Sequence, residues 1–236
     1  MRLMKKNFKV LLLCVFVAAA SCSFTTKEFD DPDKDKLLID LITYVLEKGH
    51  YDAKEMDNAF SAGVYKDFIN TMDPLKRYFL ASDIKDFSVY ETEIDDQIRN
   101  KELTFFNLVY ERFLERQVIA KSFYGDILGT PFDYTKDEMI NVDYDKLPYA
   151  TSKRELKERW RLQLKFSAIS NYYDLVDEKE NSEAKKKEAL FSGEAFEENE
   201  NAKLTTAEME EKARTTSKTS LDDYYEFVDD LERKDY

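Results

Sequence analysis

Three serine pairs are the candidate nucleophiles for hydrolytic chemistry: Ser152-Lys153, Ser217-Lys218 and Ser192-Gly193. A hydrolytic serine needs a base within hydrogen-bond reach and a sharp turn that aims backbone N–H groups at the developing oxyanion. Neighbouring residues of a helix point in different directions, so neither lysine can reach the serine beside it. Ser192 has an adjacent glycine but lies in a charged stretch with few apolar residues. We therefore predict no catalytic residue in this chain.

The single histidine, His50, is the first candidate for a metal ligand. Asp52, Glu55 and Asp57 follow it closely and could supply carboxylate ligands. However, a histidine after the last turn of one helix and acidic residues in the first turn of the next are each favoured by the helix dipole. We prefer that explanation, and we predict neither a metal site nor a cofactor.

A short run of aspartates imitates the opening of a calcium-binding loop, with Asp31, Asp33 and Asp35 at alternate positions. An EF-hand loop then requires Gly at its sixth position and Glu at its twelfth. Those positions hold Lys36 and Ile42, so the pattern does not predict a calcium site.

The N-terminus has the pattern of a secretory signal peptide, because basic residues precede an apolar stretch from Val10 to Ala20. That stretch is shorter than the roughly 20 residues of a membrane-spanning helix, which disfavours a transmembrane anchor. The sequence from Ala19 to Cys22 resembles the lipobox of bacterial lipoproteins. We expect removal of residues 1–21 and lipidation of Cys22, which would hold an exported protein to a bacterial membrane in the periplasm. Plain cleavage near Ala18-Ala19-Ala20 is the alternative.

The charge disfavours nucleic acid as a partner. The formal net charge is −13, and loss of the four basic residues of the leader takes it to −17 for residues 22–236. Such a surface repels nucleic-acid phosphates and anionic lipid headgroups. Solubility explains this charge more simply than a function in binding. Beyond Cys22 the chain has no cysteine, so the exported domain must be held together by core burial rather than by disulfides.

Apolar residues recur at helical spacing along most of the chain, and Gly and Pro are scarce, with 5 and 4 residues. Both features predict an all-α fold, a multi-helix domain that follows the signal peptide. A capping box of Ser152 and Glu155 predicts the start of a long helix. The expected helices run from Leu37 to near Gly49, from Asp52 to Met72, from Ser82 to Ile98, from Leu103 to Gly129, from Ser152 to Val176 and from Ser220 to Tyr236.

Changes in amino-acid composition along the chain suggest five segments. They are a signal peptide (1–21), a tether (22–36), a helical N-terminal domain (37–176), a charged helical or mobile segment (177–219) and a last helix (220–236). Glu, Lys, Asn and Ala dominate the charged segment, which indicates exposed helices or mobile arms. Because the last helix reaches the terminus without a Gly or Asn cap, we expect the chain to be cut inside a larger protein.

Three consecutive large apolar residues, Tyr78, Phe79 and Leu80, follow a break at Asp73-Pro74. Asp as a cap and Pro at the first helical position favour a short turn there. Burial is the usual fate of such a cluster, and we favour core packing over contact with a partner protein.

The stretch from Met72 to Ile84 resembles the DP-x-[KR]-x-YFL-x-x-D segment in the N-terminal domain of tail-specific proteases, also called carboxy-terminal processing peptidases. Further similar segments follow in the same order: Pro131–Tyr134, Asp137-Glu138, Leu147-Pro148, Glu155-Leu156 and Arg159–Arg161. The resemblance covers about residues 37–170 and, more loosely, the last helix. The residues that we assign to the family motif, in structural roles, are Asp73, Pro74, Arg77, Tyr78, Phe79, Leu80, Asp83 and Trp160.

In that family, the helical region precedes a PDZ domain, a peptidase core with a Ser-Lys dyad and a helical C-terminal domain. The resemblance therefore implies a parent serine endopeptidase that selects exported proteins by their nonpolar C-terminal tails. No position of this chain matches the motif that contains the catalytic residues, so none is carried over. The implied partners are the PDZ and peptidase domains and, through them, the protein substrates.

The alternative is a free-standing helical lipoprotein that acts as an adaptor or binding module. Adaptors of the tetratricopeptide type repeat at about 34 residues. This sequence shows no self-similarity at that period. A complete periplasmic enzyme is disfavoured, because no nucleophile, base and oxyanion donors converge.

Overall fold

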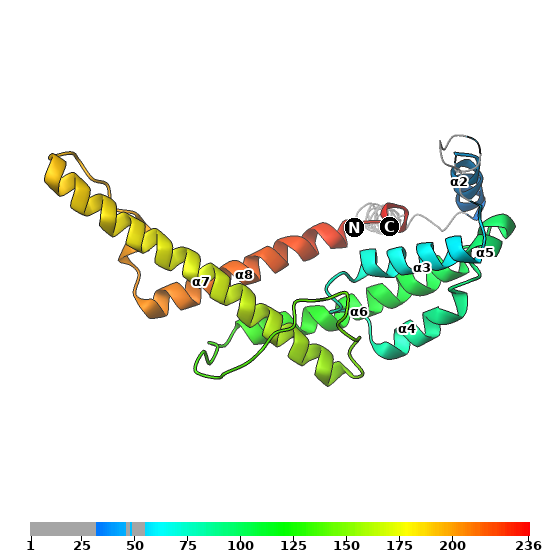
Figure 1. The fold of residues 1–236 in the computed structure, drawn as a ribbon, viewed down its shortest axis with the longest axis horizontal. Coiled ribbons are helices and arrows are strands. Elements are labelled where there is room, and N and C mark those ends of the chain that lie inside the picture. The colour runs from blue at the N-terminus through cyan, green and yellow to red at the C-terminus, as the bar shows by residue number, and fades with distance from the viewer. Residues whose placement is uncertain (1–31, 46–47, 49–54) are drawn as a thin grey trace, which may run out of the picture. The chain divides into compact units, whose positions relative to one another are not determined.

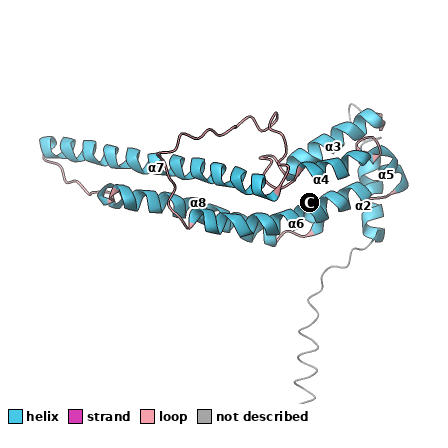
Figure 2. Cartoon of the chain, turned by 90° about the horizontal axis from the view of Figure 1, so that it is seen from below, coloured by secondary structure: helices cyan, strands magenta, loops and turns pink. Residues whose placement is uncertain are grey.

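The computed structural model describes residues 32–45, 48 and 55–236. The predicted signal peptide, the predicted lipidation residue Cys22 and the predicted helix-end residues Gly49, His50 and Asp52 lie outside the described residues. Within the described ranges the protein is all-α (Figure 2). One isolated bridge pairs Leu80 with Ala150. No helix in these ranges is long and apolar enough to cross a membrane.

The chain divides into two compact units, residues 1–54 and 55–236. The described part of the first unit is helix α2 (Pro32–Tyr44). This helix begins five positions before the expected Leu37, with Pro32 in its first turn, where the missing N–H of proline costs no intrahelical hydrogen bond. The second unit contains all the other helices that the structure describes.

Helix α3 (Asn58–Met72) begins later than expected. Its N-cap is Asp57, whose carboxylate accepts the N–H of Phe60 at 2.9 Å. The predicted start at Asp52 was therefore wrong, because residues 55–57 precede the helix. A side chain that accepts the N–H of the third helical residue satisfies a donor that has no partner within the helix.

The single helix expected from Ser82 to Ile98 is divided into α4 (Ala81–Phe87), a short 3-10 helix η2 (Ser88–Tyr90) and α5 (Ile94–Asn100). The period of apolar residues continues through the division, so the sequence pattern did not reveal it. The two α-helices have different neighbours: α4 packs on α6, and α5 packs on α3. The chain bends between them so that Phe87 and Ile94 are both buried.

The predicted helix from Leu103 to Gly129 is confirmed as α6 (Thr104–Leu128). Val109, Phe113, Gln117 and Ala120 of its predicted face are buried. The following connector, residues 129–152, is irregular as expected, with turns at 134–136 and 144–146.

Helix α7 (Lys153–Ser192) is longer than expected. Ser152 caps it by accepting the N–H of Glu155 at 3.3 Å, but the Glu155 carboxylate binds the N–H of Thr151, so the reciprocal bond of the predicted capping box is absent. The helix continues through the charged segment to Ser192. Tyr173 on this helix is 62% exposed.

Helix α8 (Thr206–Asp229) begins at a capping box of Thr205 and Glu208, well before the expected Ser220. A 3-10 helix, η3 (Glu200–Lys203), precedes it. After Asp229 the chain leaves the α-helix and ends in a short 3-10 helix, η4 (Arg233–Asp235). The predicted helix from Ser220 to Tyr236 was thus wrong at both ends.

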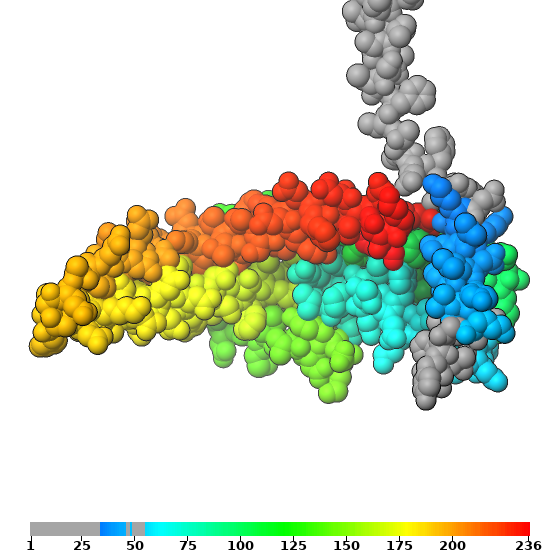
Figure 3. Space-filling model, turned by 90° about the horizontal axis from the view of Figure 1, so that it is seen from above, coloured from blue at the N-terminus to red at the C-terminus, as the bar shows by residue number. Residues whose placement is uncertain are grey.

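Helices α7 and α8 pack side by side, as their yellow and orange-to-red surfaces show in Figure 3. Small residues lie between them: Ala168 and Ala213 are fully buried, and the hydroxyls of Ser167 and Ser217 are 2.9 Å apart. Small side chains let two helix backbones approach closely. The two helices are antiparallel, because Ser167 contacts Ser217 whereas Asn171, one turn later on α7, contacts Ala213, one turn earlier on α8.

The main core consists of side chains from α3, α4, α5, α6, the beginning of α7 and the second half of α8. Figure 1 labels these helices. Its fully buried side chains include Phe79, Phe87, Val109 and Trp160. A smaller cluster of Leu175, Met209 and Ala213 holds the outer parts of α7 and α8 together. The loop between α3 and α4 and the connector therefore lie where several helices meet.

Candidate functional site

The loop between α3 and α4 is organised by the carboxylate of Asp73, which is 1% exposed. One oxygen accepts the backbone N–H of Arg77 at 2.8 Å, and the other accepts those of Tyr78 at 3.0 Å and Phe79 at 2.9 Å. Burial raises the pKa of this carboxyl above its ordinary value, although the three N–H bonds act in the opposite direction. The carboxylate fixes the loop and has no open position for a substrate.

Asp83 is a second buried carboxylate, at the start of α4. It accepts hydrogen bonds from Nε of Arg116 at 2.8 Å, from Arg112, and from the backbone N–H of Leu80 at 2.8 Å. Burial raises its pKa, but the bonds from Arg116, Leu80 and Arg112 outweigh that effect and hold the pKa below the ordinary value. Asp83 thus joins α4 to α6.

Trp160 brings α7 onto the same loop. Its indole N–H donates to the carbonyl oxygen of Arg77 at 2.7 Å, and the Arg77 guanidinium carbon lies 4.7 Å from the centre of the indole ring. Tyr78 and Phe79 are buried, as expected, and the hydroxyl of Tyr78 lies 3.3 Å from that of Tyr225 on α8. Leu80 is half-buried, whereas Pro74 is exposed. Arg77 and Tyr78 of the motif therefore contact Trp160 directly, whereas Asp83 joins α4 to α6.

The connector is fastened to this loop by cations and backbone carbonyls. Nζ of Lys76 donates to the carbonyl of Leu147 at 2.7 Å, and Arg159 donates to the carbonyls of Lys76 at 2.7 Å and Pro148 at 2.8 Å. The N–H of Ala81 donates to the carbonyl of Ala150 at 2.8 Å. Lys76 and Arg159 lie in segments that resemble the family, but sequence reasoning did not predict their contacts, because the carbonyls that they bind carry no side-chain signal.

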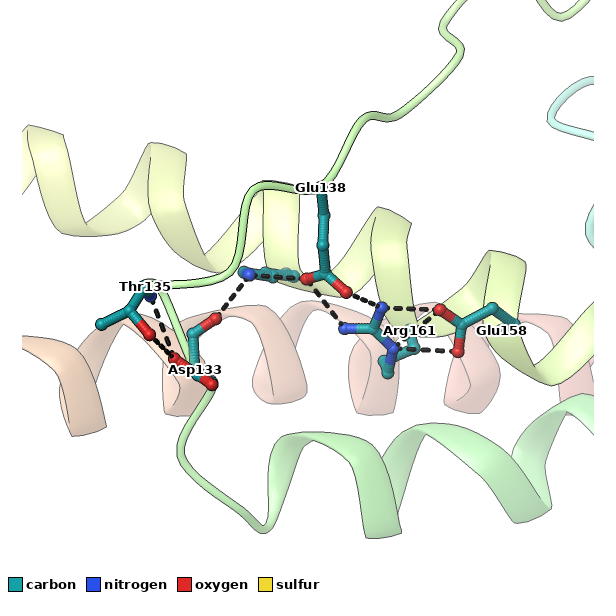
Figure 4. A network of polar contacts seen from close by, with 6 residues as sticks. Asp133, Thr135, Glu138, Glu158 and Arg161 are labelled. Carbon is teal, nitrogen blue, oxygen red and sulfur yellow. Dashed lines mark hydrogen bonds and ion pairs between the residues drawn. The ribbon is translucent and has the colours of Figure 1, made fainter.

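A polar network holds the first half of the connector against α7 (Figure 4). Lys165, only 6% exposed, donates to the carbonyl of Asp133 at 2.6 Å and to the carboxylate of Glu138 at 2.7 Å. Arg161 binds the same carboxylate and that of Glu158. Hydrogen bonds from Arg161 and Lys165 lower the pKa of Glu138 to about 2. These pairs hold one wall of the cavity beside them.

That cavity, which we call the α7 groove, has a volume of about 480 Å³ and lies among the connector, α7 and the start of α8. Aromatic and aliphatic side chains dominate it, and Met139 on its rim is 90% exposed. Open apolar cavities of this size are typical of binding sites. The lining residues are Tyr134, Lys136, Glu138, Met139, Ile140, Leu162, Lys165, Phe166, Ile169, Tyr172, Tyr173, Thr206 and Glu210.

The structure places the candidate serines apart from any catalytic arrangement. Ser152 is the cap of α7, Ser217 is buried and bonded to Ser167 and Asn171, and Ser192 bonds the carbonyl of Ala189 at 3.4 Å. Among the described residues, no group of three or more His, Cys, Asp or Glu side chains is arranged to hold a metal ion. The geometry supports packing and binding.

Comparison with known proteins adds a direct finding. The family described as the tail specific protease N-terminal domain matches residues 42–229, from within α2 to the last residue of α8. A curated relative, the tail-specific protease of Haemophilus influenzae, is 22% identical over 139 residues, which are 58% of this chain and 20% of that protein. The match therefore spans about a fifth of the length of this relative.

Proposed function

Because this chain belongs to the family of tail-specific protease N-terminal domains, we propose that it is the non-catalytic helical part of an exported serine endopeptidase. In this role it helps to enclose the proteolytic chamber and positions substrates near a downstream peptidase domain. The parent enzyme processes or degrades exported proteins that have nonpolar C-terminal tails. The observation that carries the proposal is the family match over residues 42–229.

The geometry of the second unit supports a scaffolding role. The buried carboxylates Asp73 and Asp83 are satisfied by backbone N–H groups and, for Asp83, by arginines. Groups tied in this way hold elements together and cannot exchange protons readily with a substrate. The α7 groove, in contrast, is open and apolar, and it gives a substrate polypeptide a surface to contact.

Absence of activity in the isolated segment is the first test. Purified residues 22–236, mixed with an unfolded protein that ends in a nonpolar tail, should leave that protein intact over hours on a gel. The matched sample is the Ser192→Ala variant, which should behave identically. Cleavage that this substitution abolishes would contradict a non-catalytic role.

The downstream reading frame tests the parent protein. Continuation into a PDZ-like sequence and then a peptidase core supports the proposal. A stop codon directly after Tyr236 instead supports the adaptor alternative, for which the exposed α7 groove is the favouring observation.

Export and lipid attachment form a separate part of the proposal, carried by the lipobox-like sequence before Cys22. Mass spectrometry of the membrane fraction should find a mature N-terminus at Cys22 that bears acyl chains. Cys22→Ala should remove the acyl mass and release the protein from the membrane, whereas Cys14→Ala should change neither. Recovery of an unmodified N-terminus near Ser21 would instead show plain cleavage.

A further inference from the structure

The guanidinium group of Arg77 is held in place but makes no hydrogen bond or ion pair within the part of the chain that the structure describes. Its backbone is fixed on both sides, by the bond from its N–H to Asp73 and the bond that its carbonyl accepts from Trp160. Its side chain stacks over Trp160 at 4.7 Å and over Tyr78 at 5.6 Å. A guanidinium has five N–H donors in a planar fork that matches a carboxylate. Arg77 is thus an oriented cation with its donors available.

Arg77 lies where two open cavities meet, and we call the two together the Arg77 groove. Leu75, Arg77 and Tyr224 border both cavities. The first, about 430 Å³, is otherwise walled mainly by apolar side chains, which include Met72, Phe113, Phe227, Val228 and Leu231, and also by Thr71 and Asp235. The second, about 380 Å³, is walled by residues that include Tyr144, Gln163, Leu164, Phe166 and Leu221. Phe227 and Phe166 are 63% and 50% exposed, so both cavities open to the surface.

Gln163 borders the second cavity and is tied to the loop, because its Nε2 atom donates to the carbonyl of Leu75 at 3.2 Å. Its Oε1 atom is buried and does not face a ligand in the open cavity. Ser167, Ser217 and Ser220 also line this cavity. The groove therefore offers mainly apolar walls with a few hydroxyl groups, and Arg77 is its cation.

We propose that the Arg77 groove binds a polypeptide segment in which one Asp or Glu side chain is flanked on both sides by apolar residues. Arg77 borders both cavities, so a segment that fills them places its carboxylate in the middle of its length. A C-terminal carboxylate at Arg77 would leave one cavity empty. The other charged residue in the lining, Asp235, already accepts the N–H of Glu232 at 2.8 Å. This inference does not depend on the protease assignment, because binding by this chain alone tests it.

Fluorescence anisotropy with labelled short peptides measures this binding. One peptide has a central Glu between apolar residues, the second has Gln in its place, and both have blocked ends. The Glu peptide should bind about 10-fold or more tightly than the Gln peptide, as expected for hydrogen bonds to a charged group. Arg77→Met keeps the apolar stem and should remove that preference. Arg154→Met, at an exposed arginine outside the groove, is the matched control and should preserve it.

A second variant keeps the test decisive if Arg77→Met disturbs the loop. Phe227→Ser replaces an exposed side chain and should weaken both peptides several-fold while it keeps the preference for Glu. Equal binding of the two peptides by the unaltered protein, or no binding of either, would overturn the proposal. Tighter binding of a peptide whose only carboxylate is its C-terminus would overturn the assignment to an internal acidic residue.

Discussion

The indole N–H of Trp160 donates a 2.7 Å hydrogen bond to the carbonyl oxygen of Arg77, a residue 83 positions earlier in the chain. The indole is fully buried, and its ring face also carries the Arg77 guanidinium. One side chain of α7 therefore fixes both the path of the α3–α4 loop and the position of the cation in that loop. This contact and the contacts of Asp83, Glu138 and Ala213 each lead to one testable prediction.

Trp160→Phe should lower the free energy of unfolding by about 2 to 4 kcal/mol. The substitution leaves the Arg77 carbonyl buried without its donor, which costs about 1 to 3 kcal/mol, and the smaller ring leaves a cavity. Urea unfolding followed by circular dichroism measures the change. Tyr173→Phe on the same helix, at an exposed position, should change the free energy by less than about 0.5 kcal/mol. Similar losses for the two variants would contradict this account.

Asp83→Asn should lower the free energy of unfolding by about 2 to 3 kcal/mol, because it leaves Arg112 and Arg116 without their shared carboxylate in a partly buried site. The two arginine side chains are 23% and 18% exposed, so water compensates for part of the loss. Asp86→Asn is the matched control, since Asp86 lies 3.4 Å from Arg112 but is 55% exposed. Thermal unfolding measures both variants. A larger fall in melting temperature for Asp86→Asn than for Asp83→Asn would refute the role of Asp83.

Glu138 should make the stability of the protein depend on pH in acid. Its pKa is lowered from 4.5 to about 2 in the folded protein and returns to its ordinary value on unfolding. The folded state binds this proton less tightly, so the stabilisation is complete above the ordinary pKa and is lost as the pH falls from about 4.5 towards about 2.

Urea midpoints measured across that range should therefore fall less steeply for Glu138→Gln than for the unaltered protein. Asp137→Asn, at the exposed neighbouring position, should leave the slope unchanged. Identical slopes for Glu138→Gln and the unaltered protein would show that Arg161 and Lys165 do not stabilise the ionised carboxylate.

Ala213→Leu should separate α7 from α8. The alanine is fully buried between them, and added methylenes in a packed interface typically cost about 1 to 3 kcal/mol. Hydrogen exchange should become faster in the first half of α8. Thr215→Leu, which places the same side chain on an exposed position of that helix, serves as the comparison. Unchanged exchange in Ala213→Leu would mean that the helices are not closely packed there.

The all-α fold class and the positions of the longest amphipathic helices could be predicted from the spacing of apolar residues. Helix α6 is the clearest case, because Val109, Phe113 and Ala120 recur on one face and are buried together. The resemblance carried by Asp73, Tyr78 and Asp83 also identified the family that residues 42–229 match. Local periodicity and a specific motif are properties of neighbouring residues, and a sequence displays them directly.

The first half of α8 could not be predicted in the same way. Its buried face is built from Met209, Ala213 and Ser217, and the last two add almost no apolar signal. Their importance comes from α7, whose Ala168 and Ser167 leave room for a close approach. A small residue is informative only when its partner across the interface is known.

Tertiary structure alone also decided what the ionisable residues do. The motif includes Asp73 and Arg77 but does not show what they contact, and the sequence presents Lys165 as an ordinary charged residue. Asp73 and Lys165 are buried and bonded to backbone groups, and Arg77 stacks on an indole. Their partners are peptide N–H and carbonyl groups, which every residue possesses and which carry no sequence signature. Local order was therefore encoded in the residue pattern, whereas charge placement depended on contacts between distant parts of the chain.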